Sequence, residues 1–235
     1  MDITSLQNPR VKQIVKLRDD KKQRQREGLM LVEGYDEISL ALTAGYVPRT
    51  VFVAPELARR QMESVAEETL TVSPAVFEKM SYRENPDGWL ALFPIPRISF
   101  DDLKLSPSPL IIVAESVEKP GNLGAILRTA DAAGVDAVLV CDPRLDAYSP
   151  NAVRASRGTI FTVPVVETSS AQALVWLQLH GIRILAATPS ADAEYTRQNL
   201  RLPLAVAVGT EDEGLTALWM SQADLKVKIP MVGKV

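Results

Sequence analysis

Short apolar segments alternate with helix-forming ones along the second half of the sequence, and this alternation limits the architectures open to the chain. The segments with strand character are Leu110–Ala114, Ala137–Val140, Thr162–Val166, Arg183–Ala187, Leu204–Val208 and Lys226–Ile229. The predicted helices are Leu123–Ala133, Asn151–Arg157, Ala171–Leu179 and Leu215–Ala223. Several strands are apolar throughout, which is typical of a parallel sheet with helices on both faces. The pattern therefore predicts a doubly wound α/β domain.

A smaller alternating series precedes this one. Its predicted strands are Leu29–Val32, Thr50–Val53, Leu70–Ser73 and Trp89–Phe93, and its predicted helices are Tyr35–Ala44, Glu56–Glu68 and Pro74–Met80. Proline and serine are dense between Pro94 and Pro109, as in linkers, with room for a short helix around Asp101–Leu105. We therefore predict a first domain over residues 1–96, a linker over 97–109 and a second domain over 110–235.

The composition excludes several classes of protein. The sequence has one cysteine, Cys141, and one histidine, His180, so it has no intramolecular disulfide and little material for a Cys/His metal site. No apolar run approaches the roughly 20 residues that span a bilayer, and the N-terminus lacks the apolar core of a secretory signal. We predict a cytoplasmic protein without membrane contact or a structural metal.

The net charge of −3 gives no overall sign of nucleic-acid binding, so such binding must come from a local patch. Basic residues do gather near the N-terminus, where the spacing of Val11, Ile14 and Leu17 predicts a helix with one apolar side. The candidate RNA-binding residues are Lys12, Lys16, Lys21, Lys22, Arg24 and Arg26. A solvated helix face is the commoner origin of such a run, whereas its concentration in an acidic chain fits contact with phosphates.

Polar residues follow the first apolar strand of the second domain. Lys119-Pro120-Gly121 forms a predicted turn, Asn122 is predicted to cap the next helix, and Arg128 lies well inside that helix. Side chains at this edge of an open α/β sheet lie where ligands bind. A capped crossover helix with a solvated arginine explains the same residues, so the stretch alone leaves both interpretations open.

An acidic loop, Gly209-Thr210-Glu211-Asp212-Glu213-Gly214, follows another apolar strand. Three consecutive carboxylates would repel a polyphosphate, and a phosphate-binding loop would carry Lys and Ser or Thr instead. The loop favours a cationic or polar ligand, although Asp212 and Glu213 could simply stabilise the start of the next helix. The sequence lacks both the G-x-G-x-x-G fingerprint and the G-x-S-x-G elbow, and its single histidine makes Ser/His catalysis a poor explanation.

Three segments, in this order, resemble the motifs of the SpoU/TrmH branch of the SPOUT superfamily, the RNA ribose 2′-O-methyltransferases. They are Asn122–Ala130, Val208–Leu215 and Ile229–Gly233. The N-terminal part, with Arg26-Glu27-Gly28 and Leu31-Val32-Glu33-Gly34, is similar to the small substrate-binding domain, itself like ribosomal proteins, that precedes the catalytic domain in many members. Together the two resemblances cover nearly the whole sequence.

The resemblance implies a SPOUT-type parallel sheet with a C-terminal trefoil knot, a homodimer, and S-adenosylmethionine held in the knot. The cofactor-binding residues that it implies are Thr188, Gly209, Thr210, Ile229, Pro230 and Met231. It implies catalytic-site roles for Asn122, Arg128 and Glu211. In the family the third motif continues into a Ser-Leu-Asn-containing segment and a final helix. This sequence ends at Val235, so we expect the knot and the site to be incomplete in it.

The function that the resemblance implies is methylation of a ribose 2′-hydroxyl in RNA, with ribosomal RNA ahead of transfer RNA because of the N-terminal domain. A guanidinium stays protonated, so we expect Arg128 to stabilise the developing oxyanion rather than accept a proton. Asn122 would orient Arg128 or the ribose, and Glu211 would hold Arg128 through a charge-assisted hydrogen bond. The alternatives are a non-catalytic RNA-binding protein with the same fold and an unrelated small-molecule α/β enzyme, which the order of the motifs disfavours.

Overall fold

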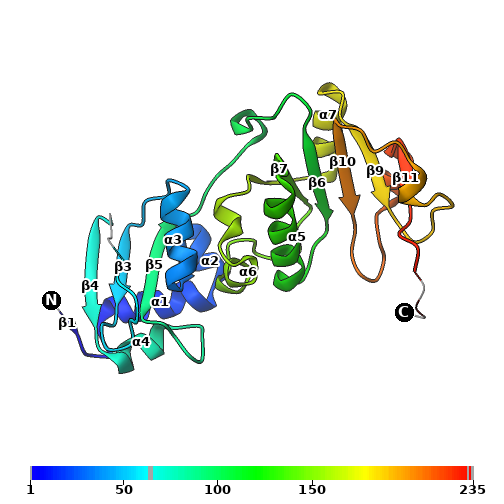
Figure 1. The fold of residues 1–235 in the computed structure, drawn as a ribbon. Helices are drawn as coiled ribbons and strands as arrows, with labels where there is room; N and C mark the ends of the chain where they lie inside the picture. The colour runs from blue at the N-terminus through cyan, green and yellow to red at the C-terminus, as the bar shows by residue number, and fades with distance from the viewer. Residues whose placement is uncertain (1, 63–65, 232, 234–235) are drawn as a thin grey trace. The chain divides into compact units, whose positions relative to one another are not determined.

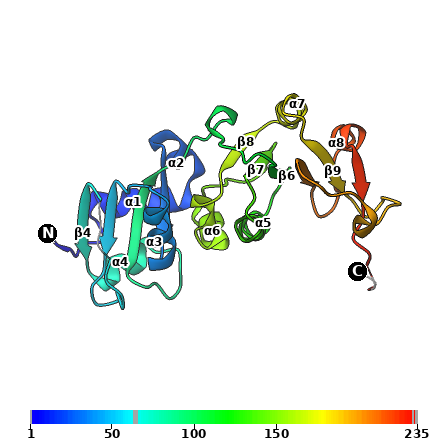
Figure 2. The ribbon, with the colours of Figure 1, turned by 45° about the horizontal axis from the view of Figure 1, so that its top comes forward.

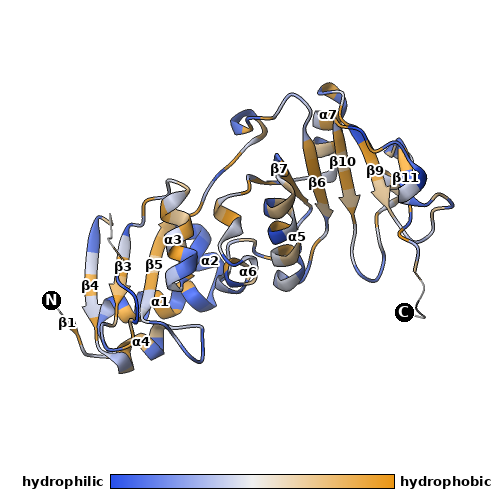
Figure 3. Ribbon diagram, in the orientation of Figure 1, coloured by the Kyte–Doolittle hydropathy of each residue, from blue (hydrophilic) through white to orange (hydrophobic). Residues whose placement is uncertain are grey.

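The computed structural model describes residues 2–62, 66–231 and 233, and the chain forms two compact units (Figure 1). The first unit contains Met1–Pro96 together with Asp146–Thr162, and the second contains Arg97–Leu145 together with Val163–Val235. Hydrophobic residues concentrate in the strands of both sheets (Figure 3). Each unit therefore has its own sheet and its own apolar core.

The first unit is built on a mixed five-stranded sheet in the order β1-β4-β3-β5-β2. The strands are β1 (Asp2–Ile3), β2 (Leu29–Glu33), β3 (Thr50–Val53), β4 (Glu68–Val72) and β5 (Trp89–Pro94). Its N-terminal helices are α1 (Pro9–Asp19), α2 (Lys21–Glu27), α3 (Tyr35–Thr43) and α4 (Pro74–Met80). Val11, Ile14 and Leu17 bury the apolar side of α1 in the core of this unit, as their spacing predicted.

The prediction of a helix over Glu56–Glu68 is wrong for those of its residues that the structure describes. Residues 55–57 form a turn, Glu68 already begins β4, and residues 63–65 lie outside the described residues. A tertiary contact takes a backbone group that this helix would use: the Arg60 carbonyl accepts the indole N–H of Trp89 at 3.0 Å. Helix propensity is a weak preference that such contacts override.

A segment remote in sequence completes the first unit. It holds α6 (Pro150–Ser156) and the 3₁₀ helix η2 (Thr159–Phe161), and α6 contacts β2. The Phe161 ring lies 5.2 Å from that of Tyr46 and 5.8 Å from that of Phe93, measured between centroids. The guanidinium of Arg24, which is 5% exposed, pairs with Asp146 at 2.7 Å. Aromatic packing and a buried ion pair thus hold this segment in the N-terminal unit.

The second unit contains a six-stranded parallel sheet in the order β11-β9-β10-β6-β7-β8. The strands are β6 (Leu110–Glu115), β7 (Ala137–Cys141), β8 (Val165–Thr168), β9 (Arg183–Ala187), β10 (Leu204–Val208) and β11 (Leu225–Val227). The helices are α5 (Pro120–Ala133), α7 (Ser170–Leu179) and α8 (Ala217–Gln222), with the 3₁₀ helices η1 (Phe100–Asp102) and η3 (Tyr195–Arg197). Figure 2 shows α5 on one face of the sheet and α7 and α8 on the other, which confirms the predicted parallel α/β sheet.

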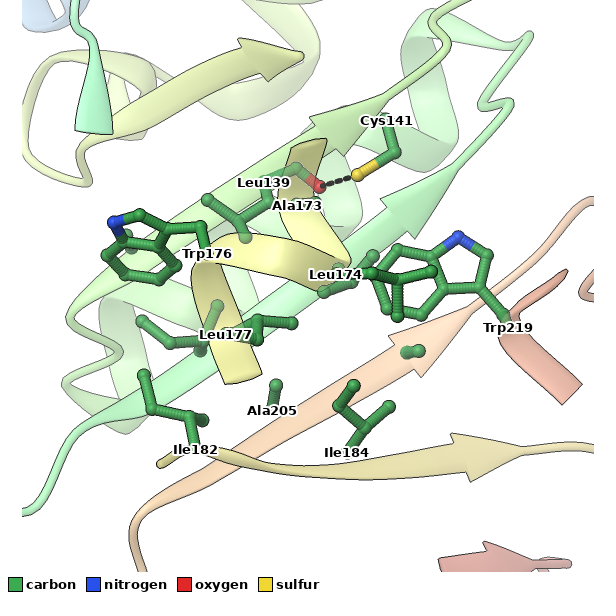
Figure 4. Close-up of a cluster of buried hydrophobic side chains, with 14 of the residues drawn as sticks. Leu139, Cys141, Ala173, Leu174, Trp176, Leu177, Ile182, Ile184, Ala205 and Trp219 are labelled. Atoms are coloured by element: carbon green, nitrogen blue, oxygen red, sulfur yellow. Dashed lines mark hydrogen bonds between the residues drawn. The ribbon is translucent and has the colours of Figure 1, made fainter. Parts of the chain in front are cut away.

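The core of this unit lies between the sheet and the helices α7 and α8. Leu139 and Ile184 from the strands meet Leu174 and Trp219 from the helices (Figure 4). Burial raises the pKa of the Cys141 thiol far above its ordinary value, so the thiol stays protonated in this core.

The proline- and serine-rich segment predicted as a linker packs on the same core. Ile98, Phe100, Leu103 and Leu105 contact it, and the Phe100 ring stacks on Trp176 with 4.9 Å between centroids. Asp136, at the start of β7, accepts hydrogen bonds from the backbone N–H groups of Ser106 and Leu110. The segment is therefore fixed on the second unit before β6 begins.

In the part of the chain that the structure describes, no helix is both long enough and apolar enough to cross a membrane. The same residues contain no group of three or more His, Cys, Asp or Glu side chains that could hold a metal ion.

Candidate active site

A cleft of about 400 Å³ opens at the carboxyl ends of β6 and β10, beside the first turns of α5. The two strands are neighbours in the sheet, and Ala114 pairs with Val208 at their ends. The turn after β6 and the loop after β10 therefore start side by side. The turn after β6 resembles the first family motif, and the loop after β10 resembles the second. The sheet thus brings the two motifs together at the carboxyl ends of its strands, where ligands bind in parallel sheets.

Asn122 and Glu211 meet across this cleft. The Asn122 amide donates a hydrogen bond from Nδ2 to Glu211 Oε1 at 2.9 Å, and the Lys119 ammonium pairs with Glu211 Oε2. The hydrogen bond from Lys119, followed by that from Asn122, lowers the pKa of Glu211, and the same ion pair raises the pKa of Lys119. Glu211 is therefore charged at neutral pH and held from two sides.

Asn122 does not cap its helix, so that part of the sequence prediction is wrong. Helix α5 begins at Pro120 with Lys119 as the N-cap residue, because proline is well suited to the first helical position. Asn122 thus lies within the first turn, and its side chain donates to Glu211 instead of accepting from the backbone of the turn. Asn122 therefore has no capping role, and its contact with Glu211 supports a role in the site.

Arg128 lies on α5 and is not among the residues that line the cleft. Its side chain is exposed, and a shift of six residues along an α-helix places it about 120° around the helix from Asn122. Ala125 and Ile126, which continue the face of Asn122, line the cleft. The structure thus brings together two of the three predicted catalytic residues, Asn122 and Glu211, whereas Arg128 lies further along the helix of Asn122 and outside the lining.

The acidic loop is closed by its own backbone. Thr210 and Gly214 exchange hydrogen bonds of 3.1 and 3.2 Å. A Cβ on Gly209 would lie 2.0 Å from the Gly214 carbonyl oxygen, so only glycine fits where β10 ends. The next helix, α8, starts at Ala217 with Thr216 as its N-cap residue. The carboxylate that accepts the Thr216 N–H is Glu115, which was not among the predicted capping residues.

Glu115 and Arg144 line the cleft and were missed by the sequence analysis. Glu115 is 3% exposed at the end of β6, and Arg144 pairs with Glu118 at 2.6 Å. A single charge after a buried strand is a weak signal, although a carboxylate at the end of the apolar run Leu110–Ala114 is unusual. Lys119 was noted only as part of a turn, since its contact with Glu211 joins residues distant in sequence.

The predicted cofactor residues do not all face this cleft. Gly209 and Thr210 line it, whereas Thr188 follows the neighbouring strand β9 and donates its N–H to Val227 at 2.9 Å. Beyond β11, Ile229 is 65% exposed and Met231 is 69% exposed, and Pro230 between them is exposed as well. The described residues thus gather the second motif at the cleft and leave Ile229, Pro230 and Met231 of the third motif after the edge strand β11, whereas residue 232 of that motif lies outside the described residues.

The charges at the cleft fit a cationic group such as the sulfonium of S-adenosylmethionine. Carboxylates outnumber cations in its lining: Glu115, Glu118, Glu211, Asp212 and Glu213 against Lys119 and Arg144. Gly209 has no side chain to cover its backbone, so a ligand can approach the backbone closely there. A cation gains from nearby carboxylates, whereas a polyphosphate would be repelled.

The basic N-terminal stretch forms α1 and α2 in the first unit. The side chains of Lys12, Lys16, Lys21, Lys22 and Arg26 are exposed. Arg24 was also predicted to bind RNA, and the structure argues against this. Its guanidinium is buried against Asp146 and donates to the carbonyls of Leu17 and Arg18. A buried arginine with these partners cannot reach an RNA phosphate, so Arg24 has a structural role.

Comparisons with known proteins agree with this geometry. A model of the SpoU rRNA Methylase family matches residues 109–235, and a model described as MRM3-like substrate binding domain matches residues 8–91. The 23S rRNA (guanosine(2553)-2'-O)-methyltransferase RlmP of Bacillus subtilis is 28% identical over 99% of this chain and 91% of its own.

Two solved structures resemble the whole chain. One, an RNA 2'-O ribose methyltransferase, is 40% identical with a TM-score of 0.85 and covers 100% of this chain and 92% of its own. The other, an AdoMet-bound rRNA methyltransferase from Sinorhizobium meliloti, is 26% identical with a TM-score of 0.89 and covers 100% of this chain and 90% of its own. The resemblance drawn from the three motifs is confirmed, and the chain belongs to the SpoU rRNA methylase family.

Proposed function

We propose that the protein transfers a methyl group from S-adenosylmethionine to the 2′-hydroxyl of a ribose in ribosomal RNA. The observation that carries this proposal is the contact between Asn122 and Glu211, which joins the first and second family motifs in one cleft. The 23S rRNA methyltransferase from Bacillus subtilis and the AdoMet-bound rRNA methyltransferase support the substrate and the cofactor.

Residues of the cleft and of helix α5 suit this reaction in three ways. S-adenosylmethionine, when bound, supplies the methyl group on a positively charged sulfur. The carboxylates of the acidic loop stabilise such a cation, and Gly209 offers backbone groups to hold it, with Thr210 next to it in the lining. Asn122, held by Glu211, can orient the ribose. Arg128, exposed on the flank of α5, can contact the adjacent phosphate and the 2′-oxygen as negative charge develops there.

The exposed basic side chains of α1 and α2 contribute to binding of the RNA. Phosphate contacts of this kind position an RNA without reading its sequence. We assign substrate binding to residues 1–96 together with the segment 146–162, which packs with them. Residues 97–109 connect the two domains, and the remainder of 110–235 carries out catalysis. The placement of Thr188 and Ile229–Met231 in the cofactor site, and the knot, are part of the same proposal.

We further propose that the protein works in the cytoplasm as a homodimer formed through the second unit. The family resemblance supports this, since each site in that family is completed across a two-fold axis. Analytical ultracentrifugation at micromolar concentration should give the mass of a dimer, and a monomer would contradict the proposal.

Methyl transfer can be tested directly with S-adenosylmethionine carrying a labelled methyl group. Ribosomal RNA and transfer RNA are offered separately, and the digested nucleosides are identified by mass spectrometry. We expect a 2′-O-methylated nucleoside from ribosomal RNA. We also expect a rate about 10²–10³ lower for Asn122→Ala and for Arg128→Ala, as for polar groups removed from comparable sites. RNA binding without methylation would support the non-catalytic alternative.

A further inference from the structure

Glu115 is a buried carboxylate to which the proposed function gives no role. It ends β6 with 3% of its surface exposed and lines the cleft. Its Oε2 accepts the backbone N–H of Thr216 at 2.8 Å, and its Oε1 accepts the Thr216 hydroxyl at 2.7 Å and the Ser170 hydroxyl at 3.3 Å. A buried charge is costly unless donors surround it, and here both carboxylate oxygens have donors.

Thr216 connects Glu115 to the acidic loop. The loop leaves β10 at Gly209, closes on itself between Thr210 and Gly214, and enters α8 through Thr216. Gly209 fixes one end of the loop by its close approach to Gly214, and Glu115 fixes the other end through Thr216. Glu211, which meets Asn122, lies between these two anchors.

We propose that Glu115 is a positioning residue for methyl transfer: by holding Thr216, it sets the acidic loop so that Glu211 reaches Asn122. The proposal rests on the proposed function for the reaction it serves. The carboxylate acts through hydrogen bonds to Thr216 and Ser170 and exchanges no proton with the substrate. Its replacement should therefore be tolerated when the new side chain keeps an oxygen for the Thr216 N–H, and harmful when it does not.

The chain contains a matched control in the other unit. Glu33 ends β2 with 7% of its surface exposed, and it accepts a hydrogen bond from the Ser81 hydroxyl and others from the backbone N–H groups of Tyr82 and Arg83. Both glutamates are buried at a strand end and hold a hydroxyl and a backbone N–H. Of the two, only Glu115 lines the cleft. If Glu115 had a purely structural role, replacing either glutamate should therefore have similar effects on stability and on methyl transfer.

Hydrogen exchange tests the anchor without any methyl transfer. In Glu115→Met, which keeps the length of the side chain and removes its acceptors, peptides covering 209–216 should exchange about tenfold faster, as expected when a hydrogen bond to a charged group is removed. Thr216→Val, which removes only the hydroxyl, should show a smaller increase in the same peptides and serves if Glu115→Met fails to fold. Unchanged exchange in Thr216→Val and in a folded Glu115→Met would overturn the proposal, even if the wild-type protein were inactive and the proposed function wrong.

Kinetics test whether the anchor acts through Glu211. At saturating substrates, Glu115→Met should lower kcat about tenfold in the wild-type background and less than about twofold in the background of Glu211→Ala, because the carboxylate that the loop holds against Asn122 is already absent there. Thr216→Val should show the same non-additivity. Glu33→Met should destabilise the protein and have equal effects on kcat in both backgrounds.

The conservative variant separates positioning from charge. Glu115→Gln keeps an oxygen for the Thr216 N–H, and the hydroxyls of Thr216 and Ser170 can turn to accept from its amide. We expect kcat within about threefold of wild type, since the hydrogen-bonded positions are kept. A decrease as large as that of Glu115→Met, or additive effects of Glu115 and Glu211, would overturn the positioning role.

Discussion

Gly209 leaves β10 so close to Gly214 that no side chain fits between them. We predict that Gly209→Ala lowers the free energy of unfolding by about 1–3 kcal/mol, as overpacking does elsewhere, and abolishes binding of S-adenosylmethionine. Thermal unfolding and titration calorimetry measure the two effects. Gly121→Ala is the control, because a Cβ there would meet nothing within 4 Å. A wild-type melting temperature for Gly209→Ala would show that the loop closes differently.

The ion pair between Lys119 and Glu211 gives a prediction about pH. Because the pKa of Glu211 is lowered, the pair is intact above the ordinary pKa of a glutamate and is lost as the pH falls through the lowered value. Lys119→Met should therefore raise the pKa of Glu211 toward its ordinary value, as followed by NMR titration of the carboxylate carbon. Lys104→Met, another exposed lysine of the second unit, should leave it unchanged. An unshifted pKa in Lys119→Met would show that Asn122 alone holds the carboxylate.

At the scale of residues, the family resemblance implied one catalytic site for Asn122, Arg128 and Glu211. It did not predict the hydrogen bond that joins Asn122 to Glu211 in the structure. The sequence did not predict the partners Lys119 and Glu115. Their contacts join positions about 90 to 100 residues apart, and a single charged residue carries no periodic signal. The cap at Asn122 was predicted from residue preference alone, whereas the helix starts three residues earlier, at Pro120.

The two basic helices of the first unit give a prediction at the scale of elements. Replacing Lys12, Lys16, Lys21 and Lys22 with Gln should weaken binding to several RNAs by a similar factor, since phosphate contacts carry little sequence information. The slope of log affinity against log salt should flatten by about 0.7 for each phosphate of a single strand that the variant no longer neutralises. Filter binding at several salt concentrations measures both effects.

The control for the basic helices replaces exposed basic residues outside them. Arg97→Gln combined with Lys104→Gln should leave the salt slope near its wild-type value, because both residues lie on the segment before β6. If the fourfold variant also keeps the wild-type slope, α1 and α2 present an ordinary solvated face. Arg24 belongs in neither set, since its replacement would break the buried pair with Asp146.

Strands were easier to predict than helices in this chain. The runs that form β6, β7, β9 and β10 are apolar almost throughout, and their residues are buried or half-buried, so their composition alone marks them. The strand predicted over Thr162–Val166 is displaced to Val165–Thr168, because residues 159–161 turn into η2 and place Phe161 against Phe93. Contacts distant in sequence decided the places where local preference failed.

The division into two units gives a prediction for the whole molecule. Residues 1–96 alone lack the segment 146–162, so Phe93 and Tyr46 are left without the ring of Phe161. We predict that this fragment unfolds at lower urea concentration than a fusion in which a flexible linker joins 1–96 to 146–162. The expected difference in unfolding free energy is about 1.5–3 kcal/mol, the value of one large buried apolar side chain. Urea titrations followed by circular dichroism give the comparison.

The same fusion with Phe161→Ala is the matched control and should lose most of the added stability. Equal midpoints for the fragment and the intact fusion would show that 146–162 adds nothing to the first unit. The sequence pattern of α6 does not indicate which of the two sheets the helix packs against. Helix periodicity depends on neighbouring residues, whereas the choice of sheet depends on contacts distant in sequence.

The route of the chain through the first unit has a consequence for the order of events on the ribosome. The N-terminal unit cannot bury Phe93 against Phe161, or pair Arg24 with Asp146, until the chain has been made as far as Thr162. That point comes roughly 65 residues after Pro96, which at about 5–20 residues per second is a delay of several seconds. By then β6, α5 and β7 have already been synthesised. The first half of this protein must therefore wait, partly assembled and with an apolar surface open, for a piece that is translated in the middle of the second half.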